Sequence, residues 1–343
     1  MQVNYYHHQL PFKYAFTTAR GTKTHQPTLI VTLTHMGLTG YGEAPAIPYY
    51  NVTIEGMIAL LVSKKQVIEK YAMQEPERFW HFLHHLYPTN NFLVCALDMA
   101  AWDLYGKMRN QPLYKLWGLT MQHNVITDYT IGMDTIDKMV EKLIANTWPM
   151  YKVKMGGAND IEMIIVLRQH TSKPILVDAN SGWTVQEAVE KIPQLQALGV
   201  LYVEEPIERH NYEGMKIVKA ASTLPLFADE SCVTEKDVAL CAESYDGINI
   251  KLTKCGGLTP ALRMIKNARQ LGLKVMVGCM NESTIGTAAM VHLQPLIDYL
   301  DADGPLLHAQ DLATGLVYDY GKVSLVNEQA PGLGIIYTGL PNI

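Results

Sequence analysis

The chain has 343 residues, of which 48% are hydrophobic and 18% charged, and its formal net charge is −5 at pH 7. This length favours a barrel-sized domain with a smaller one beside it, in an ordinary folded protein. The acidic balance and the absence of a Lys/Arg block argue against a nucleic-acid or anionic-membrane partner.

Signals for export or membrane insertion are missing from the sequence. The N-terminal stretch MQVNYYHHQL has no basic region followed by an apolar core, and no apolar run reaches the roughly 20 residues that cross a bilayer. The five cysteines are scattered and form no CxxC pair, which predicts reduced thiols instead of disulfides or a zinc site. We therefore expect a cytoplasmic protein.

Residues 1–118 are predicted to form a separate α+β unit. Alternating residues indicate strands at Gln2–Leu10 and Thr28–Thr34, and Gly37–Gly42 supplies turn residues. Apolar residues at helical spacing then predict three helices, at Glu55–Tyr71, Glu77–Leu86 and Phe92–Arg109.

The hydrophobic pattern changes near residue 125. From there, short apolar strands recur roughly every 20 to 27 residues with helical patterns between them. This order predicts an α/β fold with a closed parallel barrel. A doubly wound open sheet is the alternative, but no GxGxxG follows an early strand. The eight predicted strands are Thr127–Met133, Tyr151–Gly156, Pro174–Asn180, Val200–Pro206, Leu226–Ser231, Gly247–Thr253, Lys274–Met280 and Tyr299–Pro305.

The remaining residues, 315–343, are predicted to form short strands with Gly and Pro turns, not a further βα unit. We expect this segment to pack against the N-terminal unit. The predicted domains are thus 1–118, 119–314 and 315–343.

Charged residues cluster at the carboxyl ends of the predicted strands, where barrel enzymes gather their functional groups. Asp178, Glu204 and Asp229 come from three consecutive strands at matching depth. Because neighbouring strands lie about 4.8 Å apart, the three side chains can converge on one cation. Carboxylates without His or Cys make an oxygen-only site, which suits Mg²⁺ better than zinc.

Lysines flank this predicted metal site on both sides. Lys152 and Lys154 alternate onto one face of the second strand, and Lys251 ends the sixth. Lys154 and Lys251 are placed to transfer protons on opposite faces of one carbon, with the metal stabilising the charge left when the proton of a carboxylate's α-carbon departs. Like-charge repulsion is predicted to lower the pKa of each lysine toward that of a general base.

These strand ends resemble the enolase superfamily, in its muconate-lactonising-like branch. The resemblance covers nearly the whole chain and rests on the motifs K-x-K, D-x-N, E-E-P, D-E-S and I-K-x in this order. It implies a modified (β/α)7β TIM barrel with an N-terminal α+β capping domain and a Mg²⁺ cofactor. The metal ligands would be Asp178, Glu204 and Asp229.

The resemblance also implies roles for the lysines. Lys154 and Lys251 would be the acid/base pair, as the lysine base of this superfamily is known to act with Mg²⁺. Lys152 would help to hold the substrate carboxylate. Lys254 falls off the strand face and is expected to be a helix-entry lysine.

The eighth predicted strand distinguishes among the reactions that enzymes of this branch catalyse. Asp301-Ala302-Asp303 is similar to the D-x-D of dipeptide epimerases, in which the pair binds the substrate's α-ammonium group. The resemblance therefore implies an isomerase that inverts the α-carbon of the C-terminal residue of Ala-Xaa dipeptides, through an enediolate. Thr130 and Cys279 are further candidates for lining the pocket.

Two capping segments, 16–25 and 45–51, are expected to close over the barrel mouth, as such loops do in this superfamily. Relatives that take Ala-Glu are expected to use a basic residue in the first loop, where Arg20 and Lys23 stand here. The residues of the second segment favour small or hydrophobic dipeptides such as Ala-Ala. These residues are Ile47, Pro48, Tyr49 and Tyr50.

Other activities remain open from the sequence. An N-acylamino-acid racemase or o-succinylbenzoate synthase shares this frame but has no use for Asp301 and Asp303. A Schiff-base aldolase with a single reactive lysine and a non-catalytic binding protein are the alternatives from other classes. We also expect a homo-oligomer, as is common for such barrels.

Overall fold

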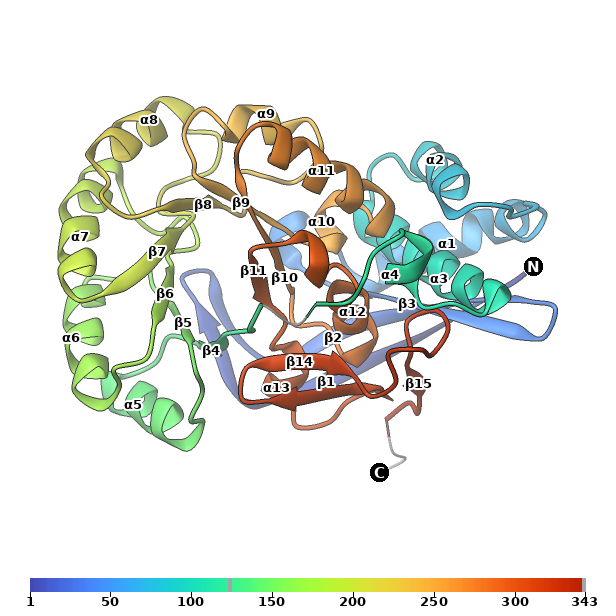
Figure 1. Ribbon diagram of the computed structural model, residues 1–343, viewed down its shortest axis with the longest axis horizontal. Helices are drawn as coiled ribbons and strands as arrows, with labels where there is room; N and C mark the ends of the chain where they lie inside the picture. Colours follow the sequence, from blue (N-terminus) through green and yellow to red (C-terminus); the bar gives the residue numbers. More distant parts are fainter. Residues whose placement is uncertain (123–124, 341–343) are drawn as a thin grey trace.

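The computed structural model describes residues 1–122 and 125–340. Two residues near the start of the predicted barrel domain, 123 and 124, and the last three of the predicted C-terminal segment, 341–343, lie outside this range. Figure 1 shows the capping elements in blue and cyan beside a barrel that runs from green to orange.

The N-terminal unit is an antiparallel sheet covered by helices. Its strands lie in the order β1 (Gln2–Thr18), β2 (Gly21–His35) and β3 (Leu38–Pro45), followed by α1 (Ile54–Glu69), α2 (Pro76–Leu86), α3 (Asn91–Arg109) and α4 (Leu113–Leu116). Two glycines of β3 allow α3 to pack closely on the sheet, because a Cβ on Gly40 or Gly42 would come within 2.1 or 1.9 Å of a helix carbonyl.

Eight parallel strands form the second sheet, in sequential order from β4 to β11. An isolated parallel bridge between Thr127 and Leu300 brings the first strand beside the last, so the sheet nearly closes. The prediction of a modified TIM barrel with an α+β capping domain is confirmed. The strands are β4 (Tyr129–Ile131), β5 (Tyr151–Lys154), β6 (Ile175–Asp178), β7 (Val200–Glu204), β8 (Leu226–Ala228), β9 (Gly247–Ile250), β10 (Lys274–Gly278) and β11 (Tyr299–Asp301).

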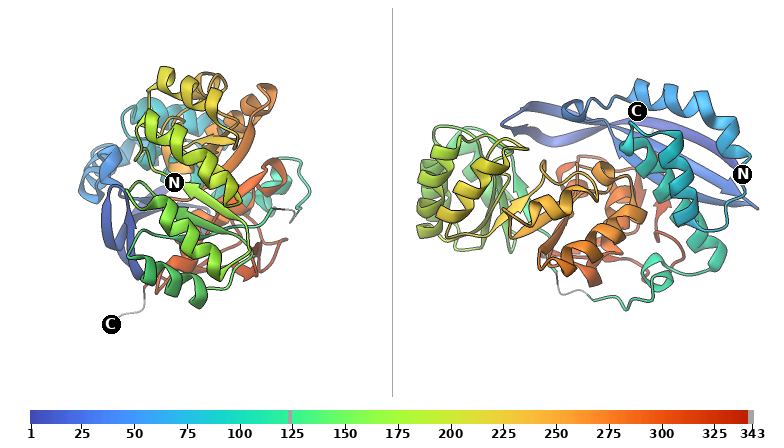
Figure 2. Two further views of the ribbon diagram at one scale, coloured as in Figure 1. Left: turned by 90° about the vertical axis from the view of Figure 1, so that its left-hand side faces the viewer. Right: turned by 90° about the horizontal axis from the view of Figure 1, so that it is seen from above.

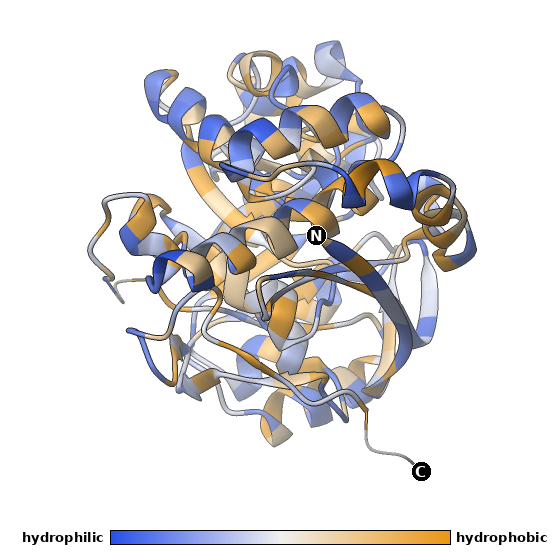
Figure 3. Ribbon diagram, turned by 90° about the vertical axis from the view of Figure 1, so that its right-hand side faces the viewer, coloured by the Kyte–Doolittle hydropathy of each residue, from blue (hydrophilic) through white to orange (hydrophobic). Residues whose placement is uncertain are grey.

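Helices lie along the outside of the barrel (Figure 1), and hydrophilic and hydrophobic residues alternate along the helices of the protein (Figure 3). Every helix in the described part of the chain is too short or too polar to cross a membrane. The barrel helices are α5 (Ile136–Ala145), α6 (Asp160–His170), α7 (Val185–Ala197), α8 (Tyr212–Ala221), α9 (Asp237–Cys241), α10 (Leu252–Cys255), α11 (Leu258–Gln270), α12 (Thr284–Val291) and α13 (Gly304–Leu307).

Alternation along the strands separates two kinds of side chain. Outward-facing residues such as Val177 and Val203 belong to the large apolar core shared with the helices. Inward-facing residues form an apolar layer at the bottom of the barrel, around Tyr202, Phe227 and Met276. Above that layer the inward-facing residues are charged, so the apolar layer lies beneath the site.

The strands are shorter than predicted, because the chain leaves the sheet at the polar residues. Asn180 and Glu205, which follow β6 and β7, have positive φ angles of 46° and 38°. Such residues end a strand and turn the backbone sharply. The predicted strand Gly247–Thr253 ends at Ile250, and α10 begins at Leu252.

The C-terminal residues form two short antiparallel pairs and contact the N-terminal unit. The Leu333 N–H donates to Asp103 of α3 at 2.8 Å, and the Tyr337 ring stacks on Tyr41 of β3. These pairs are β12 (Ala313–Thr314) with β15 (Ile336–Tyr337), and β13 (Leu316–Asp319) with β14 (Lys322–Leu325).

A buried histidine joins this segment to the helices. The Tyr114 N–H donates to Nδ1 of His292 at 3.4 Å, and Nε2 of the same ring lies 3.3 Å from the Leu333 carbonyl oxygen. Nδ1 is therefore the acceptor of a neutral ring. Burial lowers the pKa of His292 to about 4, despite the hydrogen bond to Leu333.

This histidine should make the protein sensitive to acid. Its folded pKa lies below the unfolded value, so its contribution to stability is present above pH 6.5 and is lost as the pH falls toward 4. Between pH 7 and 5 we expect His292 alone to contribute a loss of about 2 kcal/mol in the free energy of unfolding. Urea unfolding at both pH values measures it, and His292→Gln should lose about 2 kcal/mol less. Equal losses in the two proteins would contradict this role.

Candidate active site

Charged side chains of successive strands meet at the carboxyl end of the barrel. The strand register pairs Lys154 with Asp178, and Asp178 with Glu204. Asp229 comes directly after β8, and Lys251 directly after β9. The structure therefore brings these five residues together, and all of them are buried.

The three carboxylates form one cluster. Ligand oxygens of Asp178, Glu204 and Asp229 all lie within 4.8 Å of one another. Three carboxylates with no nitrogen or sulfur donor are the kind of set that Mg²⁺ prefers. The donor set therefore fits the Mg²⁺ ion that the sequence predicts.

Neighbouring polar groups fix the orientation of the cluster. The Asn180 backbone N–H donates to Asp178 Oδ1 at 2.9 Å, and the Asn249 amide donates to Glu204 Oε1 at 2.7 Å. Asn249 lies on the inward face of β9, two residues before Lys251, so strand alternation alone would have identified it.

Each of two lysines lies beside one of the carboxylates. Lys154 Nζ is 2.6 Å from Asp178 Oδ2, and Lys251 Nζ is 2.7 Å from Asp229 Oδ2. Burial lowers the pKa of Lys251, but the Asp229 carboxylate more than offsets this, and the net shift is upward. The predicted net lowering is therefore wrong for Lys251: the charge of Lys152 does lower its pKa, but the carboxylates outweigh it.

The third lysine, Lys152, lies deeper. It is fully buried, and its ammonium group is 2.7 Å from Glu204 Oε2, 2.8 Å from Asp301 Oδ2 and 3.6 Å from Asp178 Oδ2. Burial lowers its pKa, but these carboxylates raise it well above the usual value. Lys152 thus connects the predicted metal ligands with the D-x-D strand from below.

The D-x-D residues form a second cluster with Cys279. The ligand atoms of Cys279, Asp301 and Asp303 lie within 4.8 Å of one another. Burial raises the pKa of Asp303 to about 7, with a further contribution from the Asp301 charge. For Asp301 burial also acts upward, but Lys152 outweighs it and holds the pKa below its usual value.

The two weaker candidates differ in position. Cys279 lines the large cavity above the carboxylates. Thr130 donates its backbone N–H to Asp303 Oδ2 at 2.6 Å, but it lines a separate small pocket. Thr130 therefore reaches the site through Asp303.

Lys254 is the helix-entry lysine that the sequence predicts, and the structure also brings it into the site. Although it lies in α10, it is almost fully buried, and its ammonium group donates to Asp229 Oδ1 at 2.5 Å and to the Asn249 carbonyl at 3.1 Å. The short helix that follows β9 turns Lys254 back beneath the site, which strand alternation does not anticipate. Lys251 and Lys254 outweigh burial and keep the pKa of Asp229 well below its usual value.

Glu205 also belongs to the site, although the sequence assigned no role to it. Its carboxylate accepts hydrogen bonds from the Asp229 N–H at 2.7 Å, the Ser231 N–H at 3.1 Å and the Ser231 hydroxyl at 2.5 Å. These contacts hold the turn that presents Asp229. The second Glu of the E-E-P motif was its only signal in the sequence.

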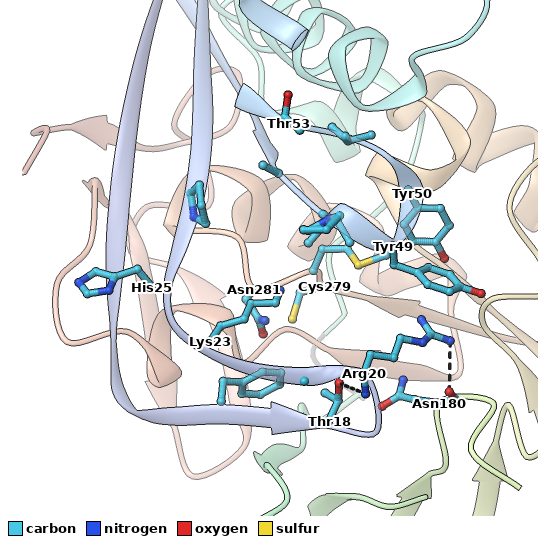
Figure 4. A pocket seen from close by; sticks show the side chains of 18 of the residues that line it. Thr18, Arg20, Lys23, His25, Tyr49, Tyr50, Thr53, Asn180, Cys279 and Asn281 are labelled. Carbon is cyan, nitrogen blue, oxygen red and sulfur yellow. Dashed lines mark hydrogen bonds between the residues drawn. The ribbon is translucent and has the colours of Figure 1, made fainter. Parts of the chain in front are cut away.

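A cavity of about 890 Å³ lies above these groups. Lys154, Asp229 and Lys251 line its floor, and both predicted capping segments contribute to its walls. Figure 4 shows Arg20 and Lys23 on the β1–β2 hairpin, with Arg20 beside Tyr49 and Lys23 beside Asn281. In Figure 2, right, the hairpin extends along the barrel toward its green and yellow elements.

Two family models match this chain. Residues 135–338 match the model described as enolase C-terminal domain-like. Residues 1–118 match the model of the mandelate racemase / muconate lactonizing enzyme N-terminal domain.

Individual relatives agree with these models. An L-Ala-D/L-amino acid epimerase of Flavobacterium johnsoniae is 45% identical over 96% of this chain and 98% of its own length. The L-Ala-D/L-Glu epimerase of Bacillus subtilis, solved with bound substrate, superposes with a TM-score of 0.92 at 28% identity, over 100% of this chain and 99% of that one. A dipeptide epimerase of Cytophaga hutchinsonii, solved with Mg and D-Ala-L-Val, gives a TM-score of 0.91 at 28% identity, over 98% and 96% of the two chains.

These matches extend over both the capping unit and the barrel, and they agree with the fold. The chain belongs to the enolase superfamily, in its mandelate racemase and muconate lactonizing enzyme branch.

Proposed function

We propose that this protein is a Mg²⁺-dependent dipeptide epimerase, an isomerase that inverts the α-carbon of the C-terminal residue of Ala-Xaa dipeptides. The observation that carries the proposal is the pair Lys154 and Lys251, which reach one cavity from β5 and from the end of β9 beside a cluster of three carboxylates. The names of the relatives support it, since they are epimerases of dipeptides.

The carboxylates and the lysines would have different roles in the reaction. Asp178, Glu204 and Asp229 would hold Mg²⁺, which supplies the positive charge that stabilises the substrate carboxylate as the α-proton leaves. One lysine removes the α-proton, and the other returns a proton to the opposite face. The reaction changes only configuration, because one proton is lost and one is gained.

The D-x-D strand would bind the other end of the dipeptide. Asp301, at the end of β11, and Asp303, just before α13, form a compact acidic cluster with Cys279, and two adjacent carboxylates suit an α-ammonium group. Lys152 would keep this strand in register with the metal ligands, through its contacts to Asp301 and Glu204.

We propose that the cavity accepts C-terminal residues larger than alanine. Its volume of about 890 Å³ leaves room beyond a dipeptide backbone, and Ile47, Pro48, Tyr49 and Tyr50 give it an apolar wall. Lys23, on the β1–β2 hairpin, supplies a cation to the same cavity. Its ammonium group donates to Gln26 Oε1 at 3.0 Å, while the Gln26 amide donates to two backbone carbonyls and so keeps its oxygen turned toward Lys23.

Lys23 should favour an acidic side chain on the substrate. Burial, and then the charges of Lys251 and Lys154, lower the pKa of Lys23 to about 8, so it is protonated below that pH. We expect the preference for Ala-Glu over the isosteric Ala-Gln to fall about tenfold in Lys23→Met. In the unaltered protein the preference should also decline as the pH rises through 8. The ratio of kcat/KM values between pH 7 and 9 measures both, and an unchanged ratio would contradict the role.

Proton NMR in D₂O with Mg²⁺ tests the function itself, using Ala-Xaa dipeptides in both configurations. We expect the α-proton signal of the C-terminal residue to disappear while the diastereomer appears. The most rapidly exchanging Xaa identifies the preferred side chain. If no dipeptide exchanges while N-succinyl amino acids do, the dipeptide assignment is wrong.

The alternative activities make a different prediction at the D-x-D strand. An N-acylamino-acid racemase or o-succinylbenzoate synthase binds no α-ammonium group, so Asp303→Asn should leave its turnover nearly intact. For a dipeptide epimerase, we expect kcat/KM to fall by roughly 10- to 100-fold, because a buried charged contact to the substrate is lost. Steady-state kinetics with Ala-Xaa and N-succinyl substrates separates the two cases.

We also propose the domain division, the location and the partners of the protein. We propose a division into the capping unit 1–118, the barrel 119–314 and a C-terminal segment 315–343. A cytoplasmic location is supported by five free, buried thiols, and the net charge of −5 supports the absence of a nucleic-acid or membrane partner. We also propose a homo-oligomer.

A further inference from the structure

The tip of the β1–β2 hairpin rests on the ends of several barrel strands. The Met133 N–H, just after β4, donates to the Thr17 carbonyl at 2.8 Å. Ala19 lies against Gly156, which follows β5, and a Cβ added to that glycine would come within 2.7 Å of the Ala19 methyl group. A side chain at Gly156 would therefore push the hairpin off the barrel.

Arg20, at the end of this hairpin, makes the strongest of these contacts. Its Nη1 lies 2.8 Å from Glu230 Oε1, and its Nη2 donates to the Asn180 carbonyl at 3.2 Å and to Ser181 Oγ at 3.3 Å. The guanidinium carbon is 3.6 Å from the centre of the Tyr49 ring, which belongs to the second capping segment. Figure 4 shows Arg20 between Tyr49 and Asn180. One side chain thus joins both capping segments to the barrel.

The barrel side of this contact continues to the proposed base. The Asn180 side-chain amide lies 3.3 Å from Glu230 Oε1 and 3.2 Å from Asp178 Oδ2. Asp178 Oδ2 in turn accepts a hydrogen bond from Lys154 at 2.6 Å. A continuous set of hydrogen bonds therefore runs from the hairpin tip to Lys154.

We propose that Arg20 and Glu230 form a latch that closes the capping hairpin over the cavity and, through Asn180, holds Asp178 and Lys154 in their reactive arrangement. Arg20 is then a positioning residue and not the partner of a substrate side chain, since its guanidinium group is already engaged by Glu230. Both residues line the cavity, but Arg20 is paired with Glu230, so Lys23 remains as the hairpin cation for a substrate side chain. The inference rests on the proposed function for its kinetic consequences, but not for the contact itself.

Kinetics of Arg20→Met, Glu230→Gln and the double variant test the latch. Each single variant should lower kcat/KM by roughly 10- to 100-fold, and the double variant should be no worse than the poorer single one. The loss should lie mainly in kcat and be equal for Ala-Glu and Ala-Gln, because the contact acts on the base. Arg20→Lys, which keeps the charge, should recover part of it. Additive losses, or a loss confined to Ala-Glu, would overturn the proposal.

Hydrogen–deuterium exchange of the free protein provides a readout that does not depend on the reaction. Backbone amides at the tip of the hairpin should exchange faster in both single variants than in the unaltered protein. Lys13→Met, which removes a charge from an exposed position of the same hairpin, should change neither exchange nor kinetics. Unaltered exchange in Arg20→Met would refute the latch, whereas failure of every dipeptide to react would refute only the proposed function.

Discussion

Replacing either proposed base should abolish epimerisation but leave exchange of the α-proton in one of the two diastereomers. In Lys154→Met or Lys251→Met, we expect inversion to fall by about 10³-fold or more, since general acid–base catalysis by a positioned side chain contributes about 10²- to 10⁴-fold. The remaining lysine still faces one side of the α-carbon. It should remove and return the proton of one diastereomer, with deuterium incorporation and retained configuration.

The two variants should therefore exchange opposite diastereomers of the same dipeptide. NMR in D₂O, started from each pure diastereomer, measures inversion and exchange separately. Lys138→Met, at an exposed position on α5, is the matched control and should behave like the unaltered protein. A variant that still inverts both diastereomers would show that the assignment of two bases is wrong. Exchange of the same diastereomer by both variants would also contradict it.

Loss of the metal or of one of its proposed ligands should have an effect of similar size. Chelation with EDTA should stop turnover, and adding back Mg²⁺ should restore it. Asp178→Asn, Glu204→Gln and Asp229→Asn should each lower activity by about 10²-fold or more, because even the loss of a group that only orients a metal ligand costs about 10- to 100-fold. Without these charges the substrate carboxylate loses its partner as the α-proton leaves.

The metal prediction is best measured by calorimetric titration of Mg²⁺ alongside the kinetics. Weaker Mg²⁺ binding should accompany each loss of activity. Glu208→Gln changes an exposed carboxylate four residues after Glu204 and should leave both unchanged. Full activity after exhaustive chelation would contradict metal dependence and would favour a Schiff-base mechanism, which borohydride trapping would detect.

Much of the barrel and its charged end could be predicted from the sequence, because alternation along a strand is a local property. Lys154, Asp178 and Glu204 each end a short strand, and parallel strands in register then place them side by side. The capping loops were also placed correctly above the cavity, which both segments line.

What escaped prediction depends on contacts between distant parts of the chain or on the exact path of a turn. Arg20 meets Glu230 across 210 positions of sequence, and nothing near either residue indicates the other. Lys254 returns to the site only because α10 begins immediately after β9. The pKa of Lys251 depends on its distance from Asp229, which no sequence pattern specifies.

The route of the chain around the cavity has a consequence for the order in which the protein folds during synthesis. The cavity wall includes Phe16, near the start of the chain, and Asn281, near its end. During synthesis the hairpin leaves the ribosome long before the strand that carries Asp301. The hairpin therefore has no complete barrel to pack against until synthesis is nearly finished. Contacts of such long sequence separation form slowly. Catalytic competence should therefore be among the last properties that a newly made chain acquires, well after its helices.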